Sequence, residues 1–103
     1  MKKITLLFTM ILSTVSYSQT TITDANFQTA INTCLTTNPE DGLCTNSEYG
    51  AMPNWNVSQV TDMRNAFNGR NTFNGDLSSW NVSSVTTMAN MFEEASSFNQ
   101  DIG

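Results

Sequence analysis

The sequence has 103 residues, of which 39% are hydrophobic and 13% are charged, and it contains no histidine. This length fits one small domain or part of a larger protein, and it excludes a large enzyme. Four basic residues stand against nine acidic ones, so binding to nucleic acid or to an anionic membrane surface is not expected.

The first eighteen residues predict a secretory signal peptide. Two lysines follow Met1, an apolar stretch covers residues 4–12, and the segment ends in Ser16-Tyr17-Ser18. A basic, an apolar and a small-residue region in this order are typical of an export signal. A buried strand or helix is the alternative, but polar alternation is missing. Cleavage after Ser18 would leave two arginines against nine acids, no membrane span, and a secreted or surface-exposed protein.

Residues 19–54 predict a helical cap on the N-terminal side of the domain. Thr23 or Asp24 is the expected start of its helix, and Asn38-Pro39 is the expected end. Its apolar face should cover the first unit of a repeat array, as terminal units of repeat proteins must. The apolar residues recur at the spacing of one helix face: Phe27, Ala30, Ile31, Cys34 and Leu35.

Cys34 and Cys44 are the only cysteines of the chain. An export signal would bring them into an oxidising compartment, so we expect a disulfide between them. Two cysteines without histidine make a metal site improbable, and a catalytic cysteine would lack its base. We therefore expect no cofactor and no enzymatic activity.

Residues 55–103 contain an internal repeat with an offset of 25 residues, which we divide into repeat 1 (residues 55–79) and repeat 2 (from residue 80). Twelve of 24 aligned positions are identical. Repeat 2 stops inside the unit, so we expect the N-terminal piece of a longer array or a truncated gene product. Its open C-terminal end should expose core residues and an unpaired strand edge. The identities run from Trp55/Trp80 through Asn56/Asn81, Val57/Val82, Ser58/Ser83, Val60/Val85, Thr61/Thr86, Met63/Met88, Asn65/Asn90, Phe67/Phe92, Phe73/Phe98 and Asn74/Asn99 to Asp76/Asp101.

This period predicts an α/β repeat solenoid of leucine-rich-repeat style, with one short strand and one short helix in each coil. Thr61 and Thr86 are expected to cap the short helices. Residues 76–78 and 80–82 are expected to form very short strands. The predicted repeat core consists of Trp55, Val57, Val60, Met63, Phe67 and Phe73, with Trp80, Val82, Val85, Met88, Phe92 and Phe98 in repeat 2.

The string Trp-Asn-Val-Ser-x-Val-Thr-x-Met, with the ending Phe98-Asn99-Gln100-Asp101-Ile102-Gly103, resembles the BspA-like leucine-rich-repeat surface proteins of bacteria. Their repeats also occur in mycoplasma-type surface lipoproteins. The resemblance covers residues 49–103 and implies an exported or surface-attached bacterial protein for adhesion or protein–protein interaction, without catalytic residues. Asn56 and Asn81 stand where that family often has Asp, and Ala66 stands where it more often has Met.

Two further functions stay open at this point. The Trp and Asn columns, Trp80 above all, could bind a glycan, although packing alone demands a Trp in every coil. The chain could also be a structural spacer of a larger surface protein. If the strand side binds a partner, Ser78, Ser79 and Asn81 are candidate contacts.

Acidic residues give weaker signals. Asp76 and Asp101 would stack about 4.8 Å apart and would need solvation, backbone amides or a cation such as calcium between them. Calcium is the less favoured interpretation, because the glycine-rich calcium-binding nonapeptide is absent. Glu93 and Glu94 are adjacent, and a glycosidase would need carboxylates that face each other across a cleft, so we interpret this pair as a solvated surface.

Overall fold

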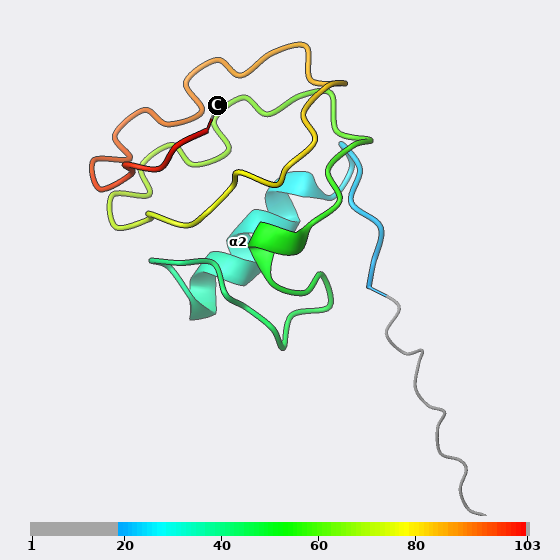
Figure 1. Cartoon of the computed structure of the whole chain (residues 1–103), viewed down its shortest axis with the longest axis horizontal. Helices are drawn as coiled ribbons and strands as arrows, with labels where there is room; N and C mark the ends of the chain where they lie inside the picture. Colours follow the sequence, from blue (N-terminus) through cyan, green and yellow to red (C-terminus); the bar gives the residue numbers. More distant parts are fainter. Residues whose placement is uncertain (1–18, 103) are drawn as a thin grey trace, which may run out of the picture.

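The computed structural model describes residues 19–102, and the predicted signal peptide lies outside the described residues. Within this range the helices are α2 (Phe27–Thr37) and the short 3-10 helix η3 (Met52–Asn54), and loops and turns connect them (Figure 1). Neither helix of this range is long and apolar enough to cross a membrane.

Helix α2 forms where the apolar spacing predicts it. All five residues of the predicted apolar face are buried. The N-cap of α2 is Asn26 instead of the predicted Thr23 or Asp24, because Thr23–Asn26 form a turn in which the Asn26 side chain accepts a hydrogen bond from the Thr23 N–H (2.9 Å). The helix ends at Thr37, and its C-cap Asn38 directly precedes Pro39, because the helical conformation is disfavoured for a residue before proline.

The predicted fold class is wrong. Residues 19–102 contain no sheet, and their only ladder element is an isolated parallel bridge between Asp62 and Thr87. The expected short helices after Thr61 and Thr86 are turns, and residues 76–78 and 80–82 are not strands. The chain is therefore not an α/β repeat solenoid, but a helical cap followed by two turn-rich repeats.

Backbone hydrogen bonding explains why the expected short helices are absent. A helix would bond each N–H to the carbonyl four residues earlier, but the N–H groups of Met63, Asn65 and Phe67 donate to carbonyls of repeat 2 instead. In addition, Asn65 and Asn90 have φ values of 60° and 58°. This left-handed conformation interrupts a helix, and Asn tolerates it better than most residues.

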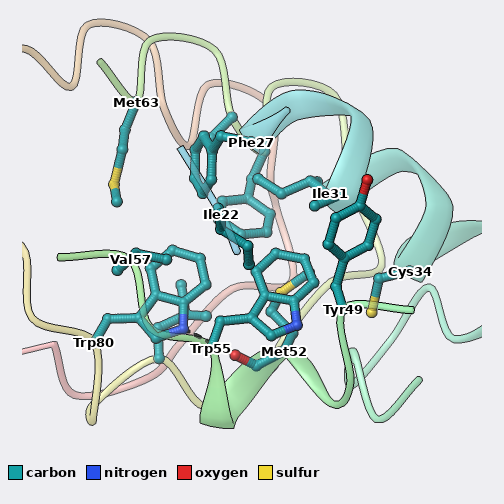
Figure 2. Packing of buried hydrophobic residues seen from close by; sticks show 14 of the residues in the cluster. Ile22, Phe27, Ile31, Cys34, Tyr49, Met52, Trp55, Val57, Met63 and Trp80 are labelled. Atoms are coloured by element: carbon teal, nitrogen blue, oxygen red, sulfur yellow. Dashed lines mark hydrogen bonds between the residues drawn. The ribbon is translucent and has the colours of Figure 1, made fainter. Parts of the chain in front are cut away.

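One hydrophobic core joins the cap to both repeats (Figure 2). Ile31 and Cys34 of α2, Met52 of η3 and Val57 of repeat 1 are each fully buried. Gly75 lets the loop after α2 approach closely, because a Cβ at this position would lie 2.7 Å from the Asp41 carbonyl oxygen. The first repeat is thus packed into the cap and does not form a separate unit.

The two repeats differ in burial despite their shared sequence. All six predicted core residues of repeat 1 are buried, whereas in repeat 2 only Trp80 is buried. Val85, Phe92 and Phe98 are half-buried, and Val82 and Met88 are exposed instead of belonging to the core. The reason is geometric: repeat 2 covers repeat 1, and nothing within residues 19–102 covers repeat 2 in turn.

Candidate interaction surface

A regular set of backbone hydrogen bonds holds the repeats in register. From Met63 to Gly69, every second N–H donates to a carbonyl 24 residues later, over distances of 2.8 to 3.0 Å. In the opposite direction, the Thr86 N–H donates to the Thr61 carbonyl oxygen (2.7 Å), and the Thr86 hydroxyl donates to the same oxygen (3.1 Å). The repeat-1 donors and their acceptors are Met63 to Thr87, Asn65 to Ala89, Phe67 to Met91, and Gly69 to Glu93.

Aromatic side chains form columns along the same direction. The Phe67 and Phe92 rings are stacked with centroids 5.5 Å apart, and Phe73 stacks on Phe98 at 5.8 Å. Within each repeat the two Phe rings also stack on each other, at 4.5 Å and 4.3 Å. These pairs add about 0.5–1.5 kcal/mol each beyond the area that they bury. The Phe residues that are identical at the 25-residue offset therefore contact each other directly.

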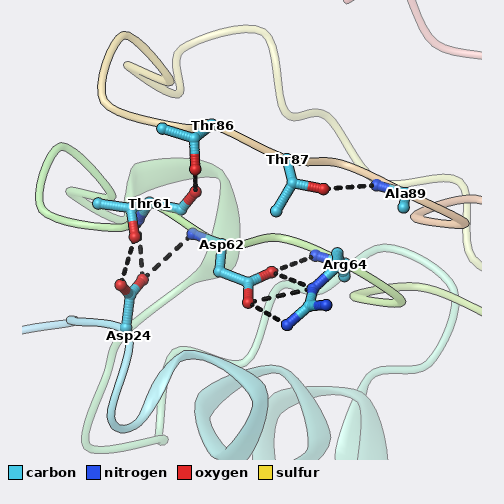
Figure 3. Close-up of polar contacts among 7 residues, drawn as sticks. All are labelled: Asp24, Thr61, Asp62, Arg64, Thr86, Thr87 and Ala89. Atoms are coloured by element: carbon cyan, nitrogen blue, oxygen red, sulfur yellow. Dashed lines mark hydrogen bonds and ion pairs between the residues drawn. The ribbon is translucent and has the colours of Figure 1, made fainter.

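The cap replaces a preceding repeat by means of side chains (Figure 3). Asp24 accepts hydrogen bonds from the Thr61 N–H (2.8 Å) and the Thr61 hydroxyl (2.5 Å), as the Thr61 carbonyl does for Thr86. On α2, the Gln28 side-chain amide donates to the Ala66 carbonyl oxygen (3.2 Å). Between the repeats, the Phe67 N–H donates in the same way to the equivalent Met91 carbonyl oxygen. Asp24 and Gln28 thus bond to part of the edge of repeat 1 that faces away from repeat 2.

The Asp24 contact predicts acid sensitivity. The Thr61 side chain first, and then its backbone N–H, lower the pKa of Asp24 below its ordinary value of 3.8. A lowered folded-state pKa means that the stabilisation is present above the unfolded-state value and is lost as the pH falls through the folded-state value. We expect the midpoint temperature of thermal unfolding to fall when the pH is lowered below about 4. Asp24→Asn should reduce this fall. Calorimetry from pH 7 to pH 2.5 measures it, and equal acid sensitivity in both proteins would contradict the assignment.

The structure contains the expected disulfide, which ties α2 to the loop after it. Cys34 and Cys44 are bonded, with Cα atoms 5.3 Å apart and a sequence separation of 10 residues. Both residues are buried. The bond fixes the loop that leads to η3 and from there to repeat 1.

Removal of this disulfide should destabilise the whole domain. A closed loop of this length contributes about 2–3 kcal/mol through the entropy of the unfolded chain. We expect the double variant Cys34→Ala/Cys44→Ala to unfold at lower urea concentration, and reduced wild-type protein to behave similarly. Urea titration followed by circular dichroism tests this, with Leu43→Ala as the control at a half-exposed neighbour. A midpoint equal to that of the oxidised protein would refute it.

Both tryptophans are structural. Trp55 and Trp80 are 4% and 8% exposed, and their rings stack on each other with centroids 6.1 Å apart. The Nε1 atoms donate to the Gly50 carbonyl (2.8 Å) and the Met52 carbonyl (2.9 Å). A sugar would need an exposed ring face, and neither of these residues offers one. The glycan interpretation centred on Trp80 therefore loses its main element.

Repeat 2 presents what we call the open face: the exposed or half-buried side chains of Val82, Val85, Met88, Phe92 and Phe98. Met88 is 45% exposed, whereas Met63 at the equivalent position is fully buried. Val82 is 37% exposed and Val57 is fully buried. Large exposed apolar side chains that gather on one side of a small domain mark an interaction surface.

The backbone of repeat 2 completes this surface. By the 25-residue offset, the N–H groups of Met88, Asn90, Phe92 and Glu94 correspond to the four repeat-1 donors, and none of them has an acceptor within residues 19–102. The Thr86 carbonyl oxygen corresponds to the acceptor at Thr61. The open face therefore combines apolar side chains with a row of backbone groups that can bind another chain.

The other predicted surface positions are not part of this face. Ser78, Ser79 and Asn81 are exposed. Asp76 and Asp101 line one shallow hollow with Ser78, Gln100 and Ile102. Ser78 lowers the pKa of Asp76 by hydrogen bonds from its side chain and its backbone N–H. Within the described residues, no group of three or more His, Cys, Asp or Glu side chains could hold a metal ion.

Glu94 shows local strain. Its φ is 61°, in the left-handed region, and the equivalent residue of repeat 1 is Gly69 with φ 77°. This conformation costs a non-glycine residue about 1 kcal/mol or more. We expect Glu94→Gly to raise the free energy of unfolding by up to about 1 kcal/mol, as measured by urea titration, with Glu93→Gly as the control at the preceding position. Destabilisation by Glu94→Gly would contradict this conformation.

The described residues form a small disulfide-bonded helical cap that carries two turn-rich repeats. Residues 42–103 match the model of the DUF285 family, described as a mycoplasma protein of unknown function. The match covers more than half of the chain, so the chain belongs to this bacterial family. No curated protein and no solved structure matches it significantly.

Sequence reasoning missed the contacts of Asp24 and Gln28 with repeat 1. The helix pattern presents Asp24 only as a helix start, and it does not single out Gln28. The sequence does contain a feature that points to Gln28 as a contact residue. It is a polar residue directly after the buried Phe27 and lies on the exposed side of the helix. An exposed apolar end of the array was predicted, but the sequence pattern assigns equal burial to Met63 and Met88 and so did not single out Met88 as exposed.

Proposed function

We propose that this protein is a non-catalytic module that is exported to the bacterial surface and binds a protein partner there, in adhesion or cell-surface interaction. The observation that carries the proposal is the open face, where Val82 and Met88 are exposed at positions that repeat 1 buries completely. The resemblance of the repeats to BspA-like surface proteins and the predicted signal peptide support the location.

The composition supports a binding role instead of catalysis. The sequence has no histidine, and both cysteines are joined in the disulfide. General acid–base and nucleophilic catalysis rely most often on such side chains. The apolar residues of the open face, in contrast, suit protein contacts, because the centre of an interface is depleted of charge and rich in aromatic residues and Met.

Export is tested first on bacteria that express the full chain. Protease treatment of intact cells should degrade the protein, and mass spectrometry of the purified protein should find Gln19 as its first residue. Protection from the protease in intact cells, together with an uncut N-terminus, would contradict export.

Binding is tested on the same cells with a photo-crosslinking amino acid at position 88. Position 79 serves as the matched control, because Ser79 is also exposed but lies outside the open face. The proposal predicts protein adducts from position 88 and few from position 79. Equal adducts from both positions, or none from either, would contradict binding through this face.

A further inference from the structure

The sequence contains two Asn-Gly pairs, Asn68-Gly69 and Asn74-Gly75. In such a pair the backbone nitrogen of glycine can attack the side-chain carbonyl carbon of asparagine, because glycine has no Cβ that would obstruct the approach. The reaction is intramolecular, so both reacting groups are already close together. The two pairs have the same chemistry, and their surroundings decide which of them reacts.

The attacking nitrogen is hydrogen-bonded in one pair and not in the other. The Gly69 N–H donates to the Glu93 carbonyl oxygen (2.8 Å). This bond would be lost when the nitrogen gives up its proton to become a nucleophile, so it opposes the reaction. The Gly75 N–H, in contrast, has no hydrogen-bond acceptor within residues 19–102. Its deprotonation therefore breaks no hydrogen bond of the described chain.

Both oxygen atoms of Asn74 accept hydrogen bonds. The backbone carbonyl oxygen accepts one from Gln100 Nε2 (3.0 Å). The side-chain oxygen Oδ1 accepts one from the Asn99 N–H (2.8 Å) and one from the same Gln100 Nε2 (3.1 Å). Within the described part of the chain, no donor reaches either oxygen of Asn68, and its Nδ2 is a donor instead.

The donors at Asn74 lie where negative charge develops during the reaction. Deprotonation of the Gly75 nitrogen places charge on the Asn74 carbonyl oxygen, since the two atoms share one peptide group. Attack of this nitrogen on Cγ then places charge on Oδ1. Preorganised donors at such positions stabilise the developing charge, and Gln100 donates to both oxygens. The surroundings thus favour reaction at Asn74 over Asn68.

We propose that Asn74 is a site of self-modification, at which the side chain cyclises with the Gly75 nitrogen and becomes aspartate or isoaspartate. Solvent hydroxide removes the Gly75 proton, the nitrogen forms a bond to Asn74 Cγ, and the Cγ–Nδ2 bond breaks. Nδ2 takes up a proton from solvent and leaves as ammonia, and a succinimide ring remains. A water molecule then opens the ring at either carbonyl, so water is consumed, ammonia is released, and no oxidant or reductant is needed. Asn74 is exposed to this water.

The product would change the contact between repeat 1 and the loop after α2. The Asn74 N–H donates to the Glu40 carbonyl oxygen (2.7 Å), and Gly75 lies close to the Asp41 carbonyl oxygen. Isoaspartate adds a carbon atom to the main chain between these two contacts. The modification would therefore weaken the attachment of repeat 1 to this loop as the protein ages.

The test incubates the purified full chain in mildly alkaline buffer, once folded and once unfolded in urea. After reduction, trypsin cuts behind Arg64 and Arg70 and so leaves Asn68 and Asn74 on different peptides. Mass spectrometry follows the replacement of the side-chain NH₂ by OH, and fragmentation of the peptides locates it. We expect Asn74 of the folded protein to react at least about tenfold faster than Asn68, and the two residues to react at similar rates in urea.

Variants test the role of the donors. Gln100→Ala removes the donor to both Asn74 oxygens and should slow the reaction at Asn74 at least about tenfold. Gln100→Glu places a carboxylate there, which cannot donate, and should slow it at least as much. Gln59→Ala is the matched control and should react as wild type, because Gln59 is exposed and gives Asn74 no hydrogen bond. Unchanged circular dichroism shows that the variants fold.

Three results would overturn the inference. In the folded protein, reaction of Asn74 that is no faster than that of Asn68 would refute the site itself. An equally strong preference for Asn74 in urea would assign the difference to the neighbouring residues in the sequence and not to the fold. An unchanged rate in Gln100→Ala would refute the stabilisation of charge by this side chain.

Discussion

Phe67→Ala is expected to cost about 3–5 kcal/mol in the free energy of unfolding, which is a large part of the stability of a small domain. Phe67 is fully buried and stacks on Phe73 and Phe92. Its N–H also bonds to the Met91 carbonyl. Loss of the ring leaves a cavity between the cap and both repeats. Urea and thermal unfolding followed by circular dichroism measure the effect.

The matched control is Phe92→Ala, at the equivalent position of repeat 2. Phe92 is half-buried, since only one of its sides is covered along the column. Because the hydrophobic contribution scales with the buried area, we expect about half the loss of Phe67→Ala. Equal losses from the two variants would show that the repeats are equally buried, which contradicts the open face.

Trp80→Ala is expected to be similarly severe, at about 3–5 kcal/mol. The ring packs between Trp55, Phe27 and Phe67, with centroids 5.9 to 6.2 Å away. It is thus the side chain of repeat 2 that reaches back to α2 through Phe27. Thermal unfolding should show a broad transition at much lower temperature, or none.

Trp80→Phe separates the ring from its hydrogen bond. It keeps an aromatic ring in the stack and removes the Nε1 donor to the Met52 carbonyl (2.9 Å). The Met52 carbonyl keeps a second partner, because it also accepts a hydrogen bond from the Trp55 N–H (3.1 Å). The lost bond therefore costs about 0.5–1.5 kcal/mol, and we expect an intermediate loss. Full stability of Trp80→Ala would contradict the buried position, and would return the ring to consideration as a ligand-binding group.

The sequence predicted those features that depend on local patterns. The spacing of Phe27, Ala30 and Ile31 predicted the buried face of α2, and Pro39 predicted its end. The repeat offset predicted which residues are neighbours, because identical aromatic residues stack on each other at this offset. These signals are local, or they repeat at a fixed period.

The conformation of each repeat could not be predicted in the same way. Thr61, Met63 and Phe67 have the spacing of a short amphipathic helix, but the N–H groups of Met63 and Phe67 find acceptors in the next repeat. This competition is decided by contacts between segments 24 residues apart. The difference between Met63 and Met88 is also invisible in the pattern, since it depends on which repeat is covered.

Amide hydrogen exchange of the free protein decides whether repeat 1 is covered on both sides and repeat 2 on one side only. We expect slow exchange at Met63, Asn65, Phe67 and Gly69, whose N–H groups are bonded to repeat 2. Exchange should be at least about tenfold faster at the equivalent Met88, Asn90, Phe92 and Glu94. Equal protection of the two sets would contradict the open face and the function proposed for it.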